Sequence, residues 1–161
     1  MKTRLTRTVE RVEQVFWTIV FSARKQAGER GVLLPKRFAS KAKIERFLRK
    51  TMTPCLAKRV IGSLDLRRIR GRLAIPVGDG IGAPPIVKAR VLAAAGRTAT
   101  VAVWFAFDRD DRFFRVYQLR RKADGRWIVF GRHPLDYPFG RAGGRRREPS
   151  VGCCAPCVGS S

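Results

Sequence analysis

The only histidine of the chain, His133, is the first side chain to consider for acid–base chemistry. Asp136 follows three residues later, and a His–Asp pair can move protons when both side chains face one cavity. The alternative is that His133 is a surface residue at a strand end with no catalytic role. The sequence favours this, because few other titratable groups lie near His133. We adopt this alternative and predict no catalytic residue.

Tyrosine and aspartate side chains are the other candidates for catalysis. Tyr117 lies in an expected strand, and Asp108, Asp110 and Asp111 cluster between two expected strands. Because aspartate is favoured in turns, a solvated turn explains this cluster. An enzyme that uses a cavity together with His133 or Tyr117 is kept as an alternative.

The sequence predicts no metal or cofactor site. Cys153, Cys154 and Cys157 lie near the C-terminus and contain a C-x-x-C spacing, but a structural zinc needs four ligands. A thioredoxin-like motif also needs a strand-to-helix context that this Gly-rich segment lacks. Gly78–Gly82 has glycines at alternate positions, which does not match a dinucleotide-binding fingerprint. Cys55 is expected to be a small buried hydrophobe.

The chain is strongly basic, with a net charge of +23. The excess lies mainly in residues 1–75, which carry 20 Lys and Arg against 5 Asp and Glu. Such a molecule attracts polyanions and depends on salt for what it binds. Two explanations are open: selection for binding RNA or DNA, and a GC-rich genome that favours Arg codons.

The basic side chains best placed to contact phosphates lie in the helix expected from Ser40 and in residues 64–75, after the next expected helix. The helix side chains project away from an apolar stripe, and a solvated face more often carries both signs of charge than one. The predicted nucleic-acid residues are Arg46, Arg49, Lys50, Arg67, Arg68, Arg70 and Arg72. Phe113, Phe114 and Tyr117 could stack bases, although core packing is their expected use.

Three helices are expected in the first half of the chain. Over Thr6–Gln26, apolar residues recur every three or four positions, which predicts an amphipathic helix. A second helix is expected to begin at Ser40, which is a good N-cap residue. The pair Thr53-Pro54 predicts a third start, with a short helix over Cys55–Ile61.

The stretch from Pro84 to Pro134 predicts four strands joined by short turns. The strand-like runs are Ile86–Ala95, Thr98–Phe107, Phe113–Arg121 and Arg126–Gly131. Connections this short make neighbouring strands antiparallel, since a parallel crossover takes about a dozen residues or more. Before them, residues 64–75 fit either a strand or an irregular edge. The fold class is therefore α+β, with N-terminal helices packed on a curved antiparallel β-meander.

Two motifs have counterparts in a known superfamily. One is the helix restart Thr53-Pro-Cys-Leu56, and the other is the strand ending Asp124-Gly-Arg-Trp-Ile128. Together with the strands around Lys88–Leu92 and Thr98–Phe105, they resemble the nuclear-transport-factor-two-like superfamily with its cystatin-like cone. The resemblance covers about residues 6–134. It implies a curved sheet that wraps helices into a cone whose mouth holds a ligand, a partner or nothing.

These patterns predict one domain with a binding role. Residues 1–140 are expected to form a single α+β cone-like domain, and residues 141–161 a disordered Arg/Gly/Cys tail. The first hypothesis is a non-enzymatic binding or accessory module whose partner, or second copy in a homodimer, docks on the sheet face or in the cone mouth. The alternatives are a basic nucleic-acid-binding protein that uses the Arg-rich N-terminal half, and a small-molecule enzyme that uses the cone cavity.

No segment is expected to span a membrane. The longest apolar run, Val15–Phe21, is far shorter than the roughly 20 residues that a spanning helix needs. The residues after it, Ser22-Ala23, run directly into Arg24-Lys25, which does not resemble a secretory cleavage site. A cytoplasmic location is the expectation.

Overall fold

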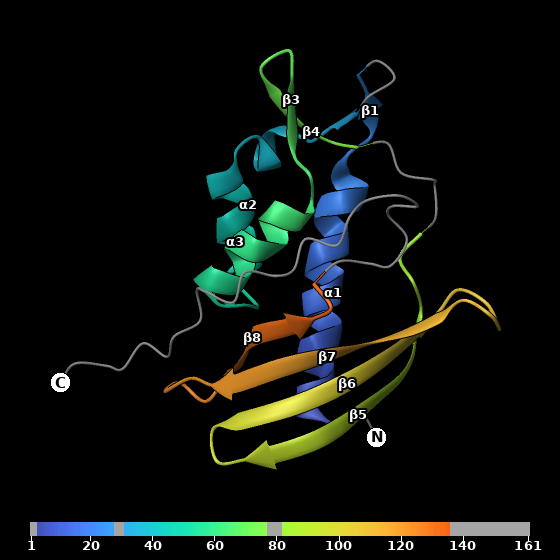
Figure 1. Ribbon diagram of the computed structural model, residues 1–161. Helices are drawn as coiled ribbons and strands as arrows, with labels where there is room; N and C mark the ends of the chain where they lie inside the picture. Colours follow the sequence, from blue (N-terminus) through green and yellow to red (C-terminus); the bar gives the residue numbers. More distant parts are fainter. Residues whose placement is uncertain (1–2, 28–30, 77–81, 136–161) are drawn as a thin grey trace.

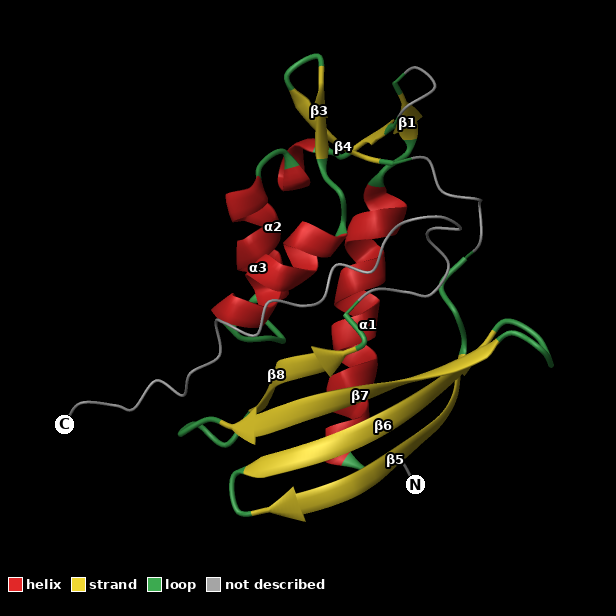
Figure 2. Cartoon of the chain, viewed as in Figure 1, coloured by secondary structure: helices red, strands yellow, loops and turns green. Residues whose placement is uncertain are grey.

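The computed structural model describes residues 3–27, 31–76 and 82–135, and these form helices packed beside two antiparallel sheets (Figures 1 and 2). The helices are α1 (Arg4–Ser22), α2 (Lys41–Leu48) and α3 (Pro54–Ser63), with the 3-10 turn η2 (Lys36–Phe38) before α2. The smaller sheet has the order β1-β2-β4-β3 and the larger one the order β5-β6-β7-β8. This confirms the predicted α+β class.

The larger sheet is the predicted meander. Its strands are β5 (Ile86–Ala95), β6 (Thr98–Ala106), β7 (Arg112–Arg121) and β8 (Trp127–His133), and each pairs antiparallel with the next. The predicted bounds lie within one residue of the observed ones except at the end of β8. That strand continues two residues beyond Gly131, so His133 is its last residue instead of lying beyond it.

Helix α1 runs across the larger sheet and contacts β5, β6 and β8 (Figure 1). Thr3 is its N-cap, with a side chain that accepts a hydrogen bond from the backbone N–H of Thr6. Its buried apolar stripe consists of Val9, Val12, Phe16 and Ile19. The helix ends at Ser22, four residues before the predicted end. The chain turns there because β1 (Lys25–Gln26) pairs with β2 (Val32–Leu33).

The link between α2 and α3 is hydrogen-bonded to β8. Ser40 and Thr53 cap the two helices as predicted, each accepting a hydrogen bond from a backbone N–H three residues on. Met52 forms an isolated parallel bridge with Val129. On either side of it, Thr53 N–H donates to Val129 C=O at 2.9 Å, and Val129 N–H donates to Thr51 C=O at 3.1 Å. The helix pair is thereby joined to the meander through its backbone.

Residues 64–75, which the sequence fitted to either a strand or an irregular edge, contain a tight hairpin. It consists of β3 (Arg67–Ile69) and β4 (Arg72–Ile75), at the end of the molecule away from the larger sheet (Figure 1). Arg70 and Gly71 between the strands have φ values of 50° and 75°. Two consecutive positive φ values are typical of a type I′ turn.

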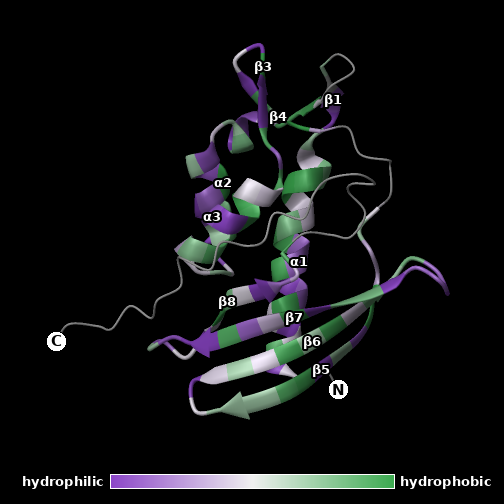
Figure 3. Cartoon of the chain, viewed as in Figure 1, coloured by the Kyte–Doolittle hydropathy of each residue, from purple (hydrophilic) through white to green (hydrophobic). Residues whose placement is uncertain are grey.

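The core lies between the helices and the larger sheet. Its buried apolar side chains include Val12, Phe16, Leu48, Met52, Leu56, Val60, Val101, Phe105, Leu119 and Val129. Figure 3 shows apolar and polar residues interchanging along β7, as expected for a strand with only one face in this core. No helix among the described residues is long and apolar enough to cross a membrane.

Candidate binding groove

A groove of about 790 Å³ runs along one side of α1, and we call it the α1 groove. The helix forms one wall with Glu10, Glu13, Gln14, Trp17, Thr18 and Phe21. The start of β5 and the residues before it, together with Phe105 of β6, form the facing wall. This volume falls within the range of typical small-molecule sites.

The helical repeat explains why α1 has both a core face and a groove face. Glu10, Gln14, Trp17 and Phe21 recur every three or four residues, so they lie in a row beside the buried stripe. The rings of Trp17 and Phe21 stack with centroids 5.2 Å apart, and Phe21 is 48% exposed. From Glu10 to Phe21 the row extends about 16 Å, at 1.5 Å per residue. The groove is therefore elongated, with aromatic rings in its middle.

One end of the α1 groove is cationic. Arg24 and Arg37 line this end, just beyond the C-terminus of α1 and in η2, and both side chains are exposed. Glu10 and Glu13 lie about three turns back along the helix. A guanidinium group binds carboxylate and phosphate groups well. The arginine end can therefore receive the anionic group of an otherwise apolar ligand.

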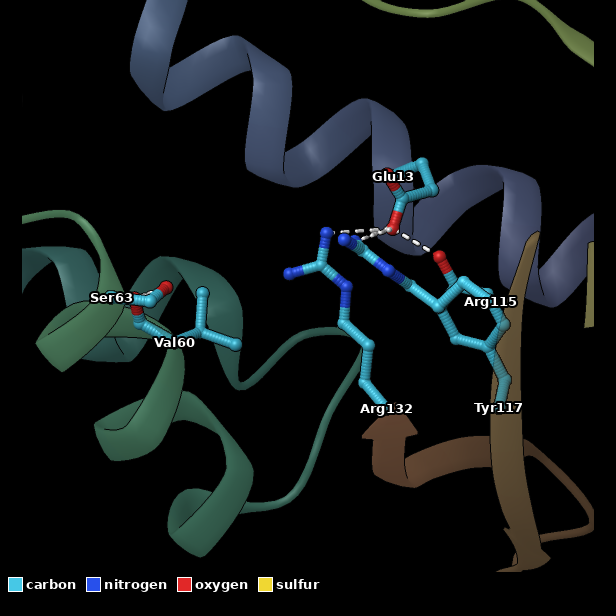
Figure 4. Close-up of polar contacts among 6 residues, drawn as sticks. All are labelled: Glu13, Val60, Ser63, Arg115, Tyr117 and Arg132. Carbon is cyan, nitrogen blue, oxygen red and sulfur yellow. Dashed lines mark hydrogen bonds and ion pairs between the residues drawn. The ribbon is translucent and has the colours of Figure 1, made fainter. Parts of the chain in front are cut away.

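Glu13 forms part of the groove wall and is held from behind by three side chains of the larger sheet (Figure 4). Tyr117 donates a hydrogen bond from its hydroxyl to Glu13 Oε1. Arg132 Nη2 lies 3.0 Å from the same oxygen, and Arg115 Nη1 lies 3.6 Å from it. All four residues are buried. We call this group the Glu13 cluster.

The Glu13 cluster anchors the helix that lines the groove. A buried carboxylate is costly unless it is paired and hydrogen-bonded, and here donors from β7 and β8 converge on one oxygen. The guanidinium of Arg132 also lies 4.8 Å from the ring centroid of Phe16 on α1. These contacts set the rotation of α1, and hence the position of the ring row, relative to the sheet.

The structure does not bring the predicted acid–base candidates together in a cavity. Tyr117 is buried in the Glu13 cluster, and neither it nor His133 lines the α1 groove. His133 is exposed at the end of β8, opposite Val116. Arg132, its neighbour in the strand, pairs with Tyr117, so His133 projects from the other face of the sheet. Asp136 lies outside the described residues.

The aspartate cluster is a turn, as the solvated interpretation predicted. Asp108 Oδ1 accepts hydrogen bonds from the backbone N–H groups of Asp110 and Asp111, at 2.8 Å each. These bonds hold the pKa of the Asp108 carboxyl below its ordinary value. Both bonds stabilise the connection between β6 and β7.

The predicted nucleic-acid residues fall into two groups, all of them exposed. Arg46 lies on α2 and Arg49 and Lys50 directly follow it, while Arg67, Arg68, Arg70 and Arg72 belong to the β3–β4 hairpin. Arg67 is paired with Asp65 at 3.0 Å. Arg49 and Lys50 line a second groove of about 420 Å³, which the hairpin arginines do not line.

We call this second groove the basic groove. It brings the predicted residues Arg49 and Lys50 together with cations that were not predicted to contact phosphates. It is lined by Arg4, Arg11, Arg49, Lys50, Lys122 and Arg126, around Trp127. Arg4 and Arg11 come from α1, and Lys122 and Arg126 from the turn between β7 and β8. Arg126 is also paired with the exposed Asp124, at 2.7 Å. The groove can bind a polyanion through several phosphates.

The aromatic residues predicted for base stacking have different environments. Tyr117 is buried, and Phe113 stacks on Phe105 with ring centroids 4.9 Å apart, so both contribute to the inner side of the sheet. Phe114 is 56% exposed. The expectation of core packing is thus confirmed for two of the three and wrong for Phe114.

Sequence reasoning missed the Glu13 cluster. A signal was present, since Glu13 lies four residues after Val9 and three before Phe16, on the apolar stripe of α1. Arg115 likewise lies between Phe113 and Tyr117 on the inner face of β7. Charged residues at core positions indicate a buried ion pair, although their partners follow only from the tertiary structure.

Several predictions fall outside the described residues or concern metal sites. Cys153, Cys154 and Cys157 and the segment 77–81 are outside the described part of the chain. Cys55 is partly buried on α3. Among the described residues, no group of three or more His, Cys, Asp or Glu side chains is arranged to hold a metal ion.

No family model matches the chain, and no curated protein matches it.

Proposed function

We propose that this chain is a non-enzymatic binding module of the nuclear-transport-factor-two-like type whose ligand binds in the α1 groove. The observation that carries the proposal is the make-up of that groove. Trp17, Phe21 and Phe105 form an apolar middle, and Arg24 and Arg37 lie at one end. Small-molecule sites commonly combine an apolar lining with a few polar groups that orient the ligand.

The family part of the proposal is supported by the arrangement of the elements. A curved four-stranded meander packs on a long N-terminal helix, as the resemblance implies (Figure 2). The helix restart at Thr53-Pro54 is hydrogen-bonded to the last strand at Val129. The first motif behind the resemblance is therefore bonded to the residue that directly follows the second, Asp124–Ile128.

The groove favours a particular ligand class. The ring row of α1 is about 16 Å long, which suits an elongated apolar body. The cations at Arg24 and Arg37 suit a carboxylate or phosphate at one end of that body. We infer an amphipathic ligand with a single anionic end.

A catalytic role has less support. The candidate acid–base residues Tyr117 and His133 do not line the α1 groove. Tyr117 is buried behind the wall residue Glu13, and His133 is exposed at the end of β8. Within the groove wall, Glu13 accepts from Tyr117 and is paired with two arginines. Binding without chemistry accounts for the geometry.

A fluorescence titration with decanoate, and with decanol as its neutral analogue, tests this proposal. Decanoate should bind with 1:1 stoichiometry and change the emission of Trp17. Phe21→Ala should lower the affinity for both decanoate and decanol about tenfold. Phe21 is half exposed, and a lost apolar contact of this size is worth roughly 1–2 kcal/mol. The double variant Arg24→Ala/Arg37→Ala should lower the affinity for decanoate but not for decanol.

Phe114→Ala is the matched control, because Phe114 is about as exposed as Phe21 but lies on the sheet. It should leave both affinities unchanged. Equal binding of decanoate by the wild type, Phe21→Ala and Arg24→Ala/Arg37→Ala would refute a ligand site in the α1 groove.

A second candidate function is polyanion binding at the basic groove. The supporting observation is the convergence of six cationic side chains from α1, the α2–α3 link and the β7–β8 turn. Phosphate contacts release counterions, so the log of the affinity for duplex DNA should fall with log salt by about 0.9 per phosphate neutralised.

Two multiple variants distinguish phosphate contacts in the basic groove from contacts on the β3–β4 hairpin. Arg11→Ala/Arg49→Ala/Lys50→Ala should reduce the salt slope for duplex DNA by about 0.9 for each contact removed. The hairpin variant Arg67→Ala/Arg68→Ala/Arg70→Ala/Arg72→Ala, which removes more charge, should change it less. If the hairpin variant changes the salt slope more than the basic-groove variant, the phosphate contacts lie on the hairpin. If the wild type does not bind duplex DNA even at low salt, polyanion binding is rejected.

A further inference from the structure

The face of the larger sheet that points away from α1 has two aromatic rings on neighbouring central strands, Trp104 on β6 and Phe114 on β7. We propose that this outer sheet face binds single-stranded nucleic acid, with bases stacked on the two rings and phosphates held by the cations around them. The proposal concerns the opposite side of the sheet from the α1 groove and does not depend on the function proposed for that groove.

The strand register places these rings together. Trp104 pairs with Phe114 on one side and with Lys88 of β5 on the other, so the three residues form one row across the sheet. The ring centroids are 6.5 Å apart, and the ring planes are inclined by 35°. The side chains on either side of Trp104 in sequence, Val103 and Phe105, are buried in the core. Alternation therefore directs Trp104 and Phe114 outward.

The rows beyond Trp104 and Phe114 contain small side chains on the central strand β6, at Thr98, Thr100 and Ala102. Ala102 is nevertheless buried between Arg90 and Val116 of the neighbouring strands, so a base would approach the rings from outside the sheet, where β6 itself has no large side chain beside Trp104. Open sheets with exposed aromatic residues are a recurrent platform for single-stranded RNA and DNA, since every base has a face that can stack.

The charge of this face has one sign. Strands β5, β6, β7 and β8 contain no Asp or Glu, and the acidic residues Asp108, Asp110, Asp111 and Asp124 lie in the turns. The exposed cations of the outer rows are Lys88, Arg90, Arg112 and Arg120. From Arg112 to Arg120 the cations span about 26 Å along β7, at roughly 3.3 Å per residue. A chain of phosphates can follow this span.

Lys88 links the two features. Its Nζ lies 5.2 Å from the ring centroid of Trp104, in a cation–π contact. The side chain is exposed and flexible, so it can exchange the ring for a phosphate when a base stacks on Trp104. A nucleotide has a base that can stack on Trp104 and a phosphate that Lys88 can bind beside it.

A second copy of this chain fits the outer sheet face less well. A symmetric dimer through this face would place the basic rows of the two copies, with Lys88, Arg90 and Arg112, against each other. Because these strands carry no acidic residue, the like charges would be uncompensated, which opposes association. A duplex also fits less well, since its base faces are already stacked and only its phosphates could be contacted.

The test compares a labelled ten-nucleotide oligothymidylate with a hairpin duplex of equal charge, by fluorescence anisotropy at about 100 mM salt. The wild type should prefer the single strand. Phe114→Ala should weaken single-strand binding about fivefold or more, the lower bound for loss of one base stack, and leave duplex binding unchanged. Trp104→Ala/Phe114→Ala should remove the preference. Phe21→Ala, on the α1 groove, is the matched aromatic control and should change neither affinity.

Charge variants give a second, independent readout. Lys88→Ala/Arg90→Ala/Arg112→Ala should flatten the salt dependence of single-strand binding, whereas the basic-groove variant Arg11→Ala/Arg49→Ala/Lys50→Ala should weaken single strand and duplex alike. Equal affinity of the wild type for both probes, or full single-strand affinity in Phe114→Ala, would overturn the proposal. A concentration-dependent dimer that Phe114→Ala abolishes, with single-strand binding intact, would overturn it in favour of a second copy.

Discussion

Glu13 shows how much one residue can determine in this fold. It lies on the buried stripe of α1, where an apolar residue would be the usual choice. Its carboxylate instead accepts from Tyr117 and is paired with Arg115 and Arg132, so one side chain connects the helix to two strands. Removing the carboxylate charge would leave two arginines buried beside a neutral group.

We therefore expect Glu13→Gln to lower the free energy of unfolding by about 3–5 kcal/mol, the usual cost of removing one partner of a buried ion pair. Tyr117→Phe should cost about 1.5–3 kcal/mol, because it removes one hydrogen bond to a charged group. Urea denaturation followed by circular dichroism measures both. Gln14→Ala, at the exposed neighbour of Glu13, should change the value by no more than about 0.5 kcal/mol.

The two single variants also test whether the cluster acts as a unit. Glu13→Gln/Tyr117→Phe should be less unstable than the sum of its parts, since both changes remove the same hydrogen bond. Strict additivity, or a Glu13→Gln protein as stable as Gln14→Ala, would show that the cluster does not anchor α1.

At the scale of elements, the β3–β4 hairpin depends on a backbone conformation that its residue types do not announce. Gly71 has a φ of 75° and follows Arg70, which has a φ of 50°. An Asn-Gly or Asp-Gly pair is the familiar signal for such a turn, and an Arg-Gly pair is weaker. The conformation is available because glycine has no Cβ and tolerates positive φ.

Two glycines with equal space around them separate backbone strain from packing. A Cβ at Gly71 or at Gly62 would meet no atom within 4 Å. Gly71→Ala should nevertheless lower the free energy of unfolding by about 1–2 kcal/mol, because of its positive φ. Gly62→Ala, inside α3, should raise it by about 0.5–1 kcal/mol. Denaturant titration measures the free energy of unfolding of both variants. If it changes in the same direction in both, the role of positive φ at Gly71 is contradicted.

At the scale of the whole molecule, charge is the dominant property. The chain has a net charge of +23, and α1, the α2–α3 region, the hairpin and the sheet all carry part of its excess of Lys and Arg. A compact body with this charge repels itself, and dissolved ions screen that repulsion. The same charge surrounds both the basic groove and the outer sheet face, so the affinity of either for a polyanion depends on ionic strength.

We expect the melting temperature to rise by several degrees between about 20 mM and about 300 mM salt, over which the Debye length shortens from roughly 20 Å to less than 10 Å. Sodium chloride and choline chloride should act alike at equal ionic strength, because screening does not depend on which cation is present. Differential scanning fluorimetry measures the shift. A melting temperature that falls or stays constant would show that self-repulsion does not limit stability.

The sequence by itself determined the three helices, the four meander strands and the fold class of this protein, but not the smaller sheet. Apolar alternation and short turns predicted the four strands of the meander to within one residue at most ends, and Ser40 and Thr53 correctly predicted two helix starts. These features depend on interactions between residues close in sequence, such as caps, turns and the two-residue period of a strand. Such interactions can be read from residue types alone.

Only the tertiary structure decided where the candidate sites lie. Arg49 and Lys50 meet Lys122 and Arg126 in one groove, whereas the hairpin arginines lie apart from it. In the sequence, however, Arg49, Lys50 and the hairpin arginines belong to one basic half, and Lys122 and Arg126 do not. Likewise, core packing was expected for both Tyr117 and Phe114, but they project from opposite faces of β7 and only the face with Tyr117 is covered by α1. The physical reason is that packing between distant segments selects which face is buried, and local patterns do not contain that choice.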